Sequence, residues 1–323
     1  MQVGTPYEKV KEMWESEEGI MYVADIESFV RINEGDRYVR APRRMRVTEL
    51  KAIAASYSYD SIGASGHLKR KSFLPRWLLD ETKRTVHSIL FEPHMQPVPG
   101  YYNIFDGFIA SKLPRLDADD TPIVDFVRDV LAASNAASAD FIMKWLAHIL
   151  KNPMEMTLVA PCFCEIDWEY MQIFFDFIVD EIIGKHYAGV TGAPKHDLLS
   201  RFANAHHNRV LVFVKLTYDT RIDKLFTEPT YAYRTKGFPT AIIKPNYLNV
   251  AIGLEKGSTA AMRNNQNLVV FKCNGEYDQD RCRVLKHVCQ DSAVAASFYN
   301  RLMNMDLHGF MPRQAAAALR NAE

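Results

Sequence analysis

The sequence has no excess of charge of either sign and no long apolar run, and each absence excludes a class of protein. Lys plus Arg and Asp plus Glu both number 39, so net charge indicates neither a nucleic-acid nor a membrane partner. A membrane-spanning helix needs about 20 apolar residues, and the richest stretch, 171–183, contains three carboxylates. No charged leader followed by an apolar segment opens the chain. We expect a soluble intracellular protein and leave open a virion or a host organelle as its location.

Cysteine is also scarce, which argues against a disulfide framework or a metal site. Five cysteines in 323 residues favour buried free thiols in a reducing compartment. One residue separates Cys162 from Cys164, where zinc-binding pairs usually have two. His206 and His207 predict a solvent-facing turn. We expect no metal and no cofactor.

Three parts are expected along the chain. Residues 1–118 mix short strand-like and helical segments with turns, which predicts an α+β region. Residues 119–155 predict a helical linker, with Thr121 as cap, Pro122 at the first helical position and a second helix over 138–150. Residues 156–323 alternate strands with helices, which predicts an α/β core with a central, mostly parallel sheet.

Continuous apolar runs predict the strands of this core. They are 157–160, 209–214, 247–252 and 268–271. One helix is expected over 167–183, ended by Gly184, and one long helix over 279–303, followed by an Ala-rich helical tail.

Several phrases carry a family resemblance. Trp145-Leu146-Ala147-His148 precedes Asn152-Pro153, and Phe226-Thr227-Glu228-Pro229-Thr230 precedes Lys236-Gly237 and Pro245-Asn246-Tyr247. In order and spacing these phrases resemble the superfamily 3 helicase domain of phage, plasmid and viral primase-helicases of the poxvirus type. The resemblance covers about residues 70 to 300. It implies an AAA+-like P-loop NTPase core that works as a ring, with each site shared between neighbouring subunits.

The same resemblance implies four groups of catalytic residues, and the sequence departs from each. A phosphate loop needs glycines and a lysine, a Walker B strand ends in acids that hold Mg²⁺, a third strand ends in a polar sensor, and an arginine finger precedes the last strand. The residues at these positions are Pro161, Cys162, Phe163, Cys164, Glu165, Ile166 and Asp167 for the loop, Val214, Lys215 and Leu216 for Walker B, and Leu254, Glu255, Gln266 and Asn267 for sensor and finger.

These departures predict a catalytically inactive helicase-fold protein. We expect it to serve as a structural or scaffolding subunit, with other protein subunits, in an assembly of viral or mobile-element origin. One alternative is a non-catalytic nucleic-acid-binding protein, and another is an NTPase with an atypical nucleotide site. Two basic runs supply candidate phosphate contacts, although such runs can equally form a solvated face. Those contacts are Arg40, Arg43, Arg44, Arg46, Lys69, Arg70 and Lys71.

Overall fold

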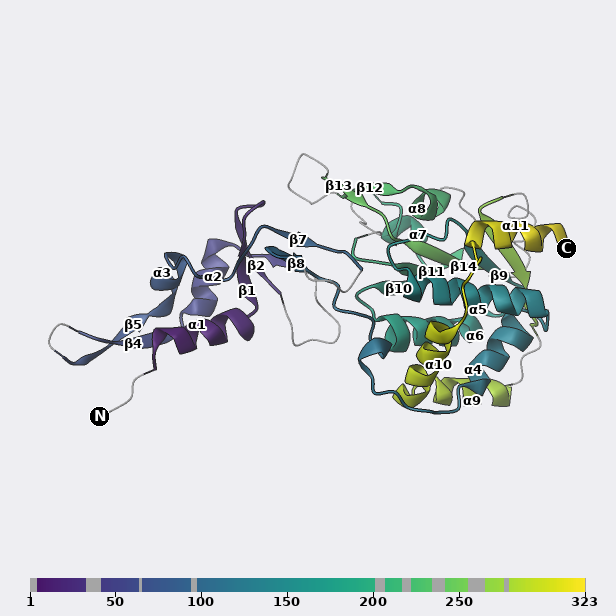
Figure 1. Ribbon diagram of the computed structural model, residues 1–323, viewed down its shortest axis with the longest axis horizontal. Helices are drawn as coiled ribbons and strands as arrows, with labels where there is room; N and C mark the ends of the chain where they lie inside the picture. Colours follow the sequence, from purple (N-terminus) through teal and green to yellow (C-terminus); the bar gives the residue numbers. More distant parts are fainter. Residues whose placement is uncertain are drawn as a thin grey trace. The chain divides into compact units, whose positions relative to one another are not determined.

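The chain divides into two compact units, Met1–Asp106 and Gly107–Glu323. The computed structural model describes residues 5–32, 42–63, 66–93, 98–200, 207–216, 222–233, 242–254, 265–275 and 279–322. The sequence predicted three parts, with boundaries at 118 and 155. The observed boundary lies at Asp106–Gly107, and the helices expected over 119–155 belong to the second unit together with the α/β core (Figure 1).

The first unit is a small α+β structure around an aromatic core. Trp14, Phe73 and Trp77 are fully buried there, with ring centroids 5.5–6.3 Å apart. Its four-stranded sheet has the order β3-β2-β1-β6, and β4–β5 and β7–β8 form separate two-stranded ribbons. The elements are α1 Tyr7–Ser16, β1 Ile20–Val23, β2 Ser28–Arg31, β3 Arg43–Arg44, α2 Val47–Ala54, β4 Ser58–Ile62, β5 Leu68–Ser72, α3 Phe73–Leu78, β6 Thr85–Val86, β7 Ser88–Leu90 and β8 Tyr101–Asn103.

The second unit is the α/β structure that the sequence predicted. Its helical segments are η1 Ala110–Lys112, α4 Thr121–Asp125, η2 Phe126–Leu131, α5 Ala136–Lys151, α6 Trp168–Phe177, η3 Ile178–Ile183, α7 Pro194–Asp197, α8 Asp223–Thr227, α9 Gln279–Val288, α10 Ser292–Asn304 and α11 Pro312–Ala322. Its strands are β9 Ala160–Cys164, β10 Ala188–Thr191, β11 Leu211–Leu216, β12 Thr230–Tyr233, β13 Ile242–Pro245, β14 Asn249–Leu254 and β15 Leu268–Lys272.

Five of these strands form one sheet of order β10-β11-β14-β9-β15, in which every neighbouring pair is parallel. Because side chains alternate across a strand, Val212 and Val214 pack on one face with Phe226 of α8. Phe213 points to the other face and stacks on Phe175 of α6, with centroids 4.0 Å apart. Helices therefore cover both faces, as Figure 1 shows for α8 and α6, which is typical of a parallel sheet.

The predicted helices are confirmed in part. The helix expected over 138–150 is α5, and the one expected over 167–183 is α6 with the π-helical segment η3, which ends at Gly184 with φ +104°. The predicted N-cap of α4 was wrong. The helix begins at Thr121, and the N-cap residue is Asp120. The prediction of a single helix over 279–303 was also wrong. It is broken into α9 and α10, because the Asp291 carboxylate accepts the Ala293 N–H (2.8 Å) and starts a new helix.

A buried hydrogen-bonded network joins the amino-terminal ends of the sheet's strands. Asn249, at the start of β14, is 0 % exposed. Its Oδ1 accepts from the backbone N–H (2.8 Å) and hydroxyl (2.9 Å) of Thr157, and its Nδ2 donates to the Val210 carbonyl (3.1 Å). Trp145 Nε1 of α5 donates to the same Thr157 hydroxyl (3.0 Å). A buried amide is tolerated here because its bonding capacity is used.

Candidate functional site

The carboxyl-terminal edge of the parallel sheet is where open α/β folds bind ligands, and the loop after β9 is its expected centre. The strand expected over 157–160 was placed too early. Pro161, Cys162, Phe163 and Cys164 belong to β9 and are buried, so they form no loop. Only Glu165, Ile166 and Asp167 connect β9 to α6. Three residues without a glycine offer few backbone N–H groups to surround a phosphate.

The Trp168 side chain occupies the space beside this short connection. A Cβ atom placed on Gly253, near the end of β14, would lie 2.7 Å from Cζ3 of the Trp168 ring and 2.8 Å from Cε of Met171. Lys215, the Cα partner of Gly253 on β11, has its Nζ 5.8 Å from the centroid of the same ring. Glycine thus permits an indole to pack directly on the β14 backbone at this edge.

The amino-terminal end of α6 carries acidic rather than basic residues. Glu165, Asp167 and Glu169 are all exposed there. Carboxylates in this position interact favourably with the partial positive charge of a helix N-terminus. They would repel a polyphosphate brought to the same place.

The other positions of the expected catalytic set do not form a common polar site. Leu254, at the sensor position, is 2 % exposed and packs in the apolar cluster that contains Val214. Gln266 and Asn267 precede β15 at the amino-terminal edge of the sheet, where the Asn267 carbonyl accepts the Ala160 N–H (2.9 Å). Leu216 ends β11, and Glu255 lies outside the described residues.

The phrase around Thr227 has a structural role in this chain. Asn246 is 4 % exposed, and its Nδ2 donates to the carbonyls of Leu225 (2.9 Å) and Glu228 (2.8 Å). Its backbone N–H donates to the Pro229 carbonyl (2.9 Å). The Thr227-Glu228-Pro229 and Pro245-Asn246 phrases therefore hold α8 and the β12–β13 hairpin together; the intervening Lys236-Gly237 lies outside the described residues.

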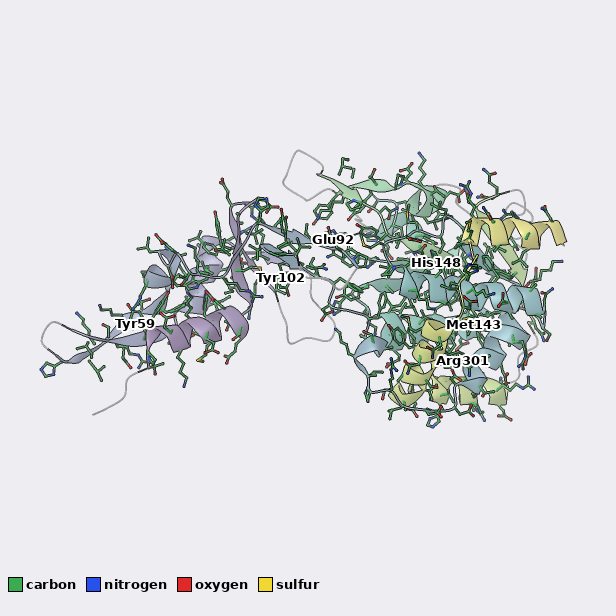
Figure 2. All side chains as sticks on the ribbon, in the orientation of Figure 1. Tyr59, Glu92, Tyr102, Met143, His148 and Arg301 are labelled. Carbon is green, nitrogen blue, oxygen red and sulfur yellow. The ribbon has the colours of Figure 1, made fainter. Side chains whose placement is uncertain are left out.

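A surface groove of about 530 Å³ in this unit is lined by α10 and by residues between 115 and 120. Asp120 on its wall is 3 % exposed and accepts two hydrogen bonds from Arg301, at 2.6 and 2.7 Å (Figure 2). Asp120 is thus neutralised by Arg301, and the pair ties the start of α4 to α10.

Neither the thiols nor the histidines form a metal centre within the described ranges. No group of three or more His, Cys, Asp or Glu side chains there could hold an ion. Burial raises the pKa of the Cys162 and Cys273 thiols, which keeps them neutral. His207 was expected to face solvent, but it is half-buried: its ring lies 4.2 Å from that of Tyr233, and burial lowers its pKa to about 4. His206 lies outside the described residues.

The candidate phosphate contacts fall on separate elements of the first unit. Lys69, Arg70 and Lys71 are exposed on β5. Arg44, on β3, donates to the Ser28 hydroxyl (2.7 Å), and Arg46 precedes α2. Nothing is described of Arg40 or of the Arg43 side chain.

Two side chains were missed in the sequence: Trp168, which packs at the carboxyl-terminal ends of the strands, and Asn249, which forms the hydrogen bonds at their amino-terminal ends. Gly253 was a usable signal, because a glycine inside a strand often marks a close approach by another group. Asn249 interrupts an apolar run, and a polar residue inside such a run predicts a satisfied buried contact.

No protein-family profile matches the chain, and none of the curated proteins searched matches it. Solved structures do match in fold. The apo C-terminal region of NrS-1 superposes with a TM-score of 0.69 at 15 % identity, covering 97 % of this chain and 74 % of that one. Two further structures of the same region, in its A form, give TM-scores of 0.67 at 15 % identity (97 % and 74 % covered) and 0.66 at 16 % identity (96 % and 70 % covered). At such identity the likeness shows the fold alone, which this chain shares with that C-terminal region. No described helix is long and apolar enough to cross a bilayer.

Proposed function

We propose that this protein is a degenerate superfamily 3 helicase, with an AAA+-like core, that does not turn over nucleotide and acts as a structural or scaffolding subunit of a larger assembly. The resemblance of the framework phrases and the fold of NrS-1's C-terminal region support the helicase-like part of the proposal. The packing of Trp168 on Gly253 beside Lys215 supports the loss of turnover.

The physical reason is that phosphate binding and side-chain packing compete for the same edge of the sheet. A nucleotide would need the space above Gly253 and a cationic, glycine-rich loop next to it. This chain has an indole ring in that space and exposed carboxylates at the start of α6. Opening the edge would cost the packing of Trp168 and would still leave like charges facing the phosphates.

Calorimetric titration of the full chain with Mg-ATP, together with a phosphate-release assay, tests the loss of turnover. We expect no saturable binding at Mg-ATP concentrations up to about 1 mM, where a Kd would correspond to a binding free energy of about −4 kcal/mol. We also expect no phosphate release above a protein-free blank. Lys215→Ala is the matched variant. Binding or hydrolysis by the unaltered protein that Lys215→Ala abolishes would show an atypical nucleotide site and overturn the proposal.

The scaffolding part is tested by the mass of the protein purified from its native source. Light scattering on the eluted species should give a mass above the 37.0 kDa of one chain, because a subunit remains with its partners. Elution as a lone 37.0 kDa chain without partner or nucleic acid contradicts it.

A further inference from the structure

The β4–β5 ribbon of the first unit is an exposed structure on a rigid base. Its two strands pair only with each other, from Ser58↔Ser72 to Ile62↔Leu68, and all five residues of β5 are exposed. Figure 1 shows the ribbon extending past α1 and α3 of its own unit. Tyr59 (Figure 2), which is 6 % exposed, and Phe73, directly after β5, anchor its base in the aromatic core.

The positive charge on this ribbon is not used by the fold. Lys69, Arg70 and Lys71 form no ion pair among the described residues. The one carboxylate of the two strands, Asp60, is the Cα partner of Arg70 and accepts the Thr5 N–H at 2.9 Å, so Lys69 and Lys71 carry the ribbon's excess charge. Because side chains alternate along a strand, Lys69 and Lys71 lie on one face and Arg70 on the other. Arg70 is oriented by the Ser58 hydroxyl, which accepts from its Nε at 2.6 Å.

The groove at the ribbon's base does not share this charge excess. It measures about 640 Å³, and its wall includes Glu8 and Asp80 beside Arg76; Lys71 of β5 lies at its border with the ribbon. The Arg76 guanidinium lies 3.9 Å from the centroid of the Tyr7 ring and is used in packing. The unbalanced charge therefore belongs to the projecting strands.

The ribbon's shape and charge fit a nucleic-acid duplex. A two-stranded ribbon enters the major groove of B-DNA, which is about 12 Å wide and lined on both sides by phosphates. Cations on both faces of a ribbon can reach both lines of phosphates. At the outer end the Cα partners Ile62 and Leu68 are 76 % and 45 % exposed and are suited to apolar contact with base edges such as thymine methyl groups.

An anionic membrane fits this surface less well. Membrane-surface binding depends on a sizeable apolar face, usually with aromatic residues, beside the cations. Apart from the exposed pair Ile62 and Leu68, the residues between them in the sequence, 63–67, supply neither an aromatic side chain other than His67 nor a long apolar one. Nucleic acid is therefore the partner that fits the ribbon better.

We propose that the β4–β5 ribbon is a duplex-binding arm that enters the major groove, with Lys69 and Lys71 against one phosphate line and Arg70 against the other. This inference stands independently of nucleotide turnover and of the scaffolding role, since it concerns a surface of the first unit.

Fluorescence anisotropy with the full chain and a labelled 20-base-pair DNA duplex, at about 50 to 200 mM KCl, tests this arm. Each phosphate contact contributes about 0.9 to the slope of log affinity against log salt. Lys69→Gln/Lys71→Gln should therefore lower the slope by about 1.8 and Arg70→Gln by about 0.9. The control, Lys9→Gln/Lys51→Gln, removes the same charge from exposed positions on α1 and α2 and should leave affinity within twofold.

Three results would overturn the proposal. Absence of duplex binding at about 50 mM KCl would show that the ribbon does not bind duplexes. Equal losses in the two double variants assign binding to net charge rather than to the ribbon. A single strand or anionic phospholipid vesicles bound more tightly than the duplex, with the same sensitivity to Lys69 and Lys71, would identify a different occupant. Unchanged circular dichroism and melting temperature in each variant ensure that binding is compared between folded proteins.

Discussion

The carboxyl-terminal edge of the parallel sheet and the β4–β5 ribbon are opposites in how they use charge. At the sheet edge an expected cationic loop is replaced by packing, with Trp168 on Gly253 and Leu254 buried. On the ribbon three cations are exposed, and of these Arg70 donates to the Ser58 hydroxyl at 2.6 Å. The parallel-sheet unit is thus held by apolar contacts and satisfied amides, whereas these exposed cations lie in the other unit.

The largest expected effect comes from the network at the sheet's amino-terminal edge. Asn249→Leu keeps the volume but removes the acceptor of the buried Thr157 N–H and hydroxyl. It also removes one of two donors to the Val210 carbonyl, which keeps the backbone N–H of residue 249 (2.8 Å). Since the unpaired N–H costs about 1–3 kcal/mol and each lost hydrogen bond about 0.5–1.5 kcal/mol, urea unfolding should show a loss of about 3–4 kcal/mol. Asn300→Leu, on α10 and half-buried, is the control and should change stability by less than about 0.5 kcal/mol. Equal losses would mean that the Asn249 amide is not specially important.

The second effect concerns the close contact at the candidate nucleotide edge. Gly253→Ala puts a methyl group 2.7 Å from the Trp168 ring, and such overpacking costs about 1–3 kcal/mol. Gly192→Ala is the control because nothing lies within 4 Å of its added Cβ. Adding Trp168→Ala should recover the part of the cost that is due to the ring, as a double-mutant cycle measures, and leave the part due to Met171 Cε at 2.8 Å. Additive losses would show that the ring does not fill this space.

A smaller effect is expected on the pH dependence of stability, which should differ between a half-buried histidine and an exposed one. Burial lowers the pKa of His207 from 6.5 to about 4, so its neutral ring stabilises the fold above pH 6.5 and that contribution is lost as the pH falls toward 4. Allowing for its partial exposure, stability should fall by about 1–2 kcal/mol from pH 7 to pH 5 through this group. Unfolding of His207→Phe at both pH values should lack this part of the dependence, and His308→Phe, at an exposed site, should retain it.

The smallest effect on stability is expected on the ribbon. Lys69→Gln/Lys71→Gln should change the free energy of unfolding by less than about 0.5 kcal/mol, because exposed side chains without partners contribute little. Urea unfolding checks this value. A loss above about 1 kcal/mol would mean that the fold uses these charges, which would undo the contrast with the sheet edge.

The sequence predicted the α/β core because its signal is local. Continuous apolar runs gave β11, β14 and β15 within two residues, and Gly184 ended η3 as expected. The strand was expected to end at residue 160 and β9 ends at Cys164, since Pro161 and the cysteines do not look like strand formers. Their burial between β14 and β15 overrides that local preference.

By itself the sequence determined which chemical groups are present: an acidic, glycine-free connection after the core's first strand, a lysine near the end of β11, and three consecutive cations at 69–71. Only the tertiary structure decided that Trp168 packs on Gly253 and that Asn249 joins three segments distant in sequence. It also decided that the three cations stand on a ribbon with both faces exposed. Residue identity is local, but the space around a side chain depends on strands brought together from far along the chain.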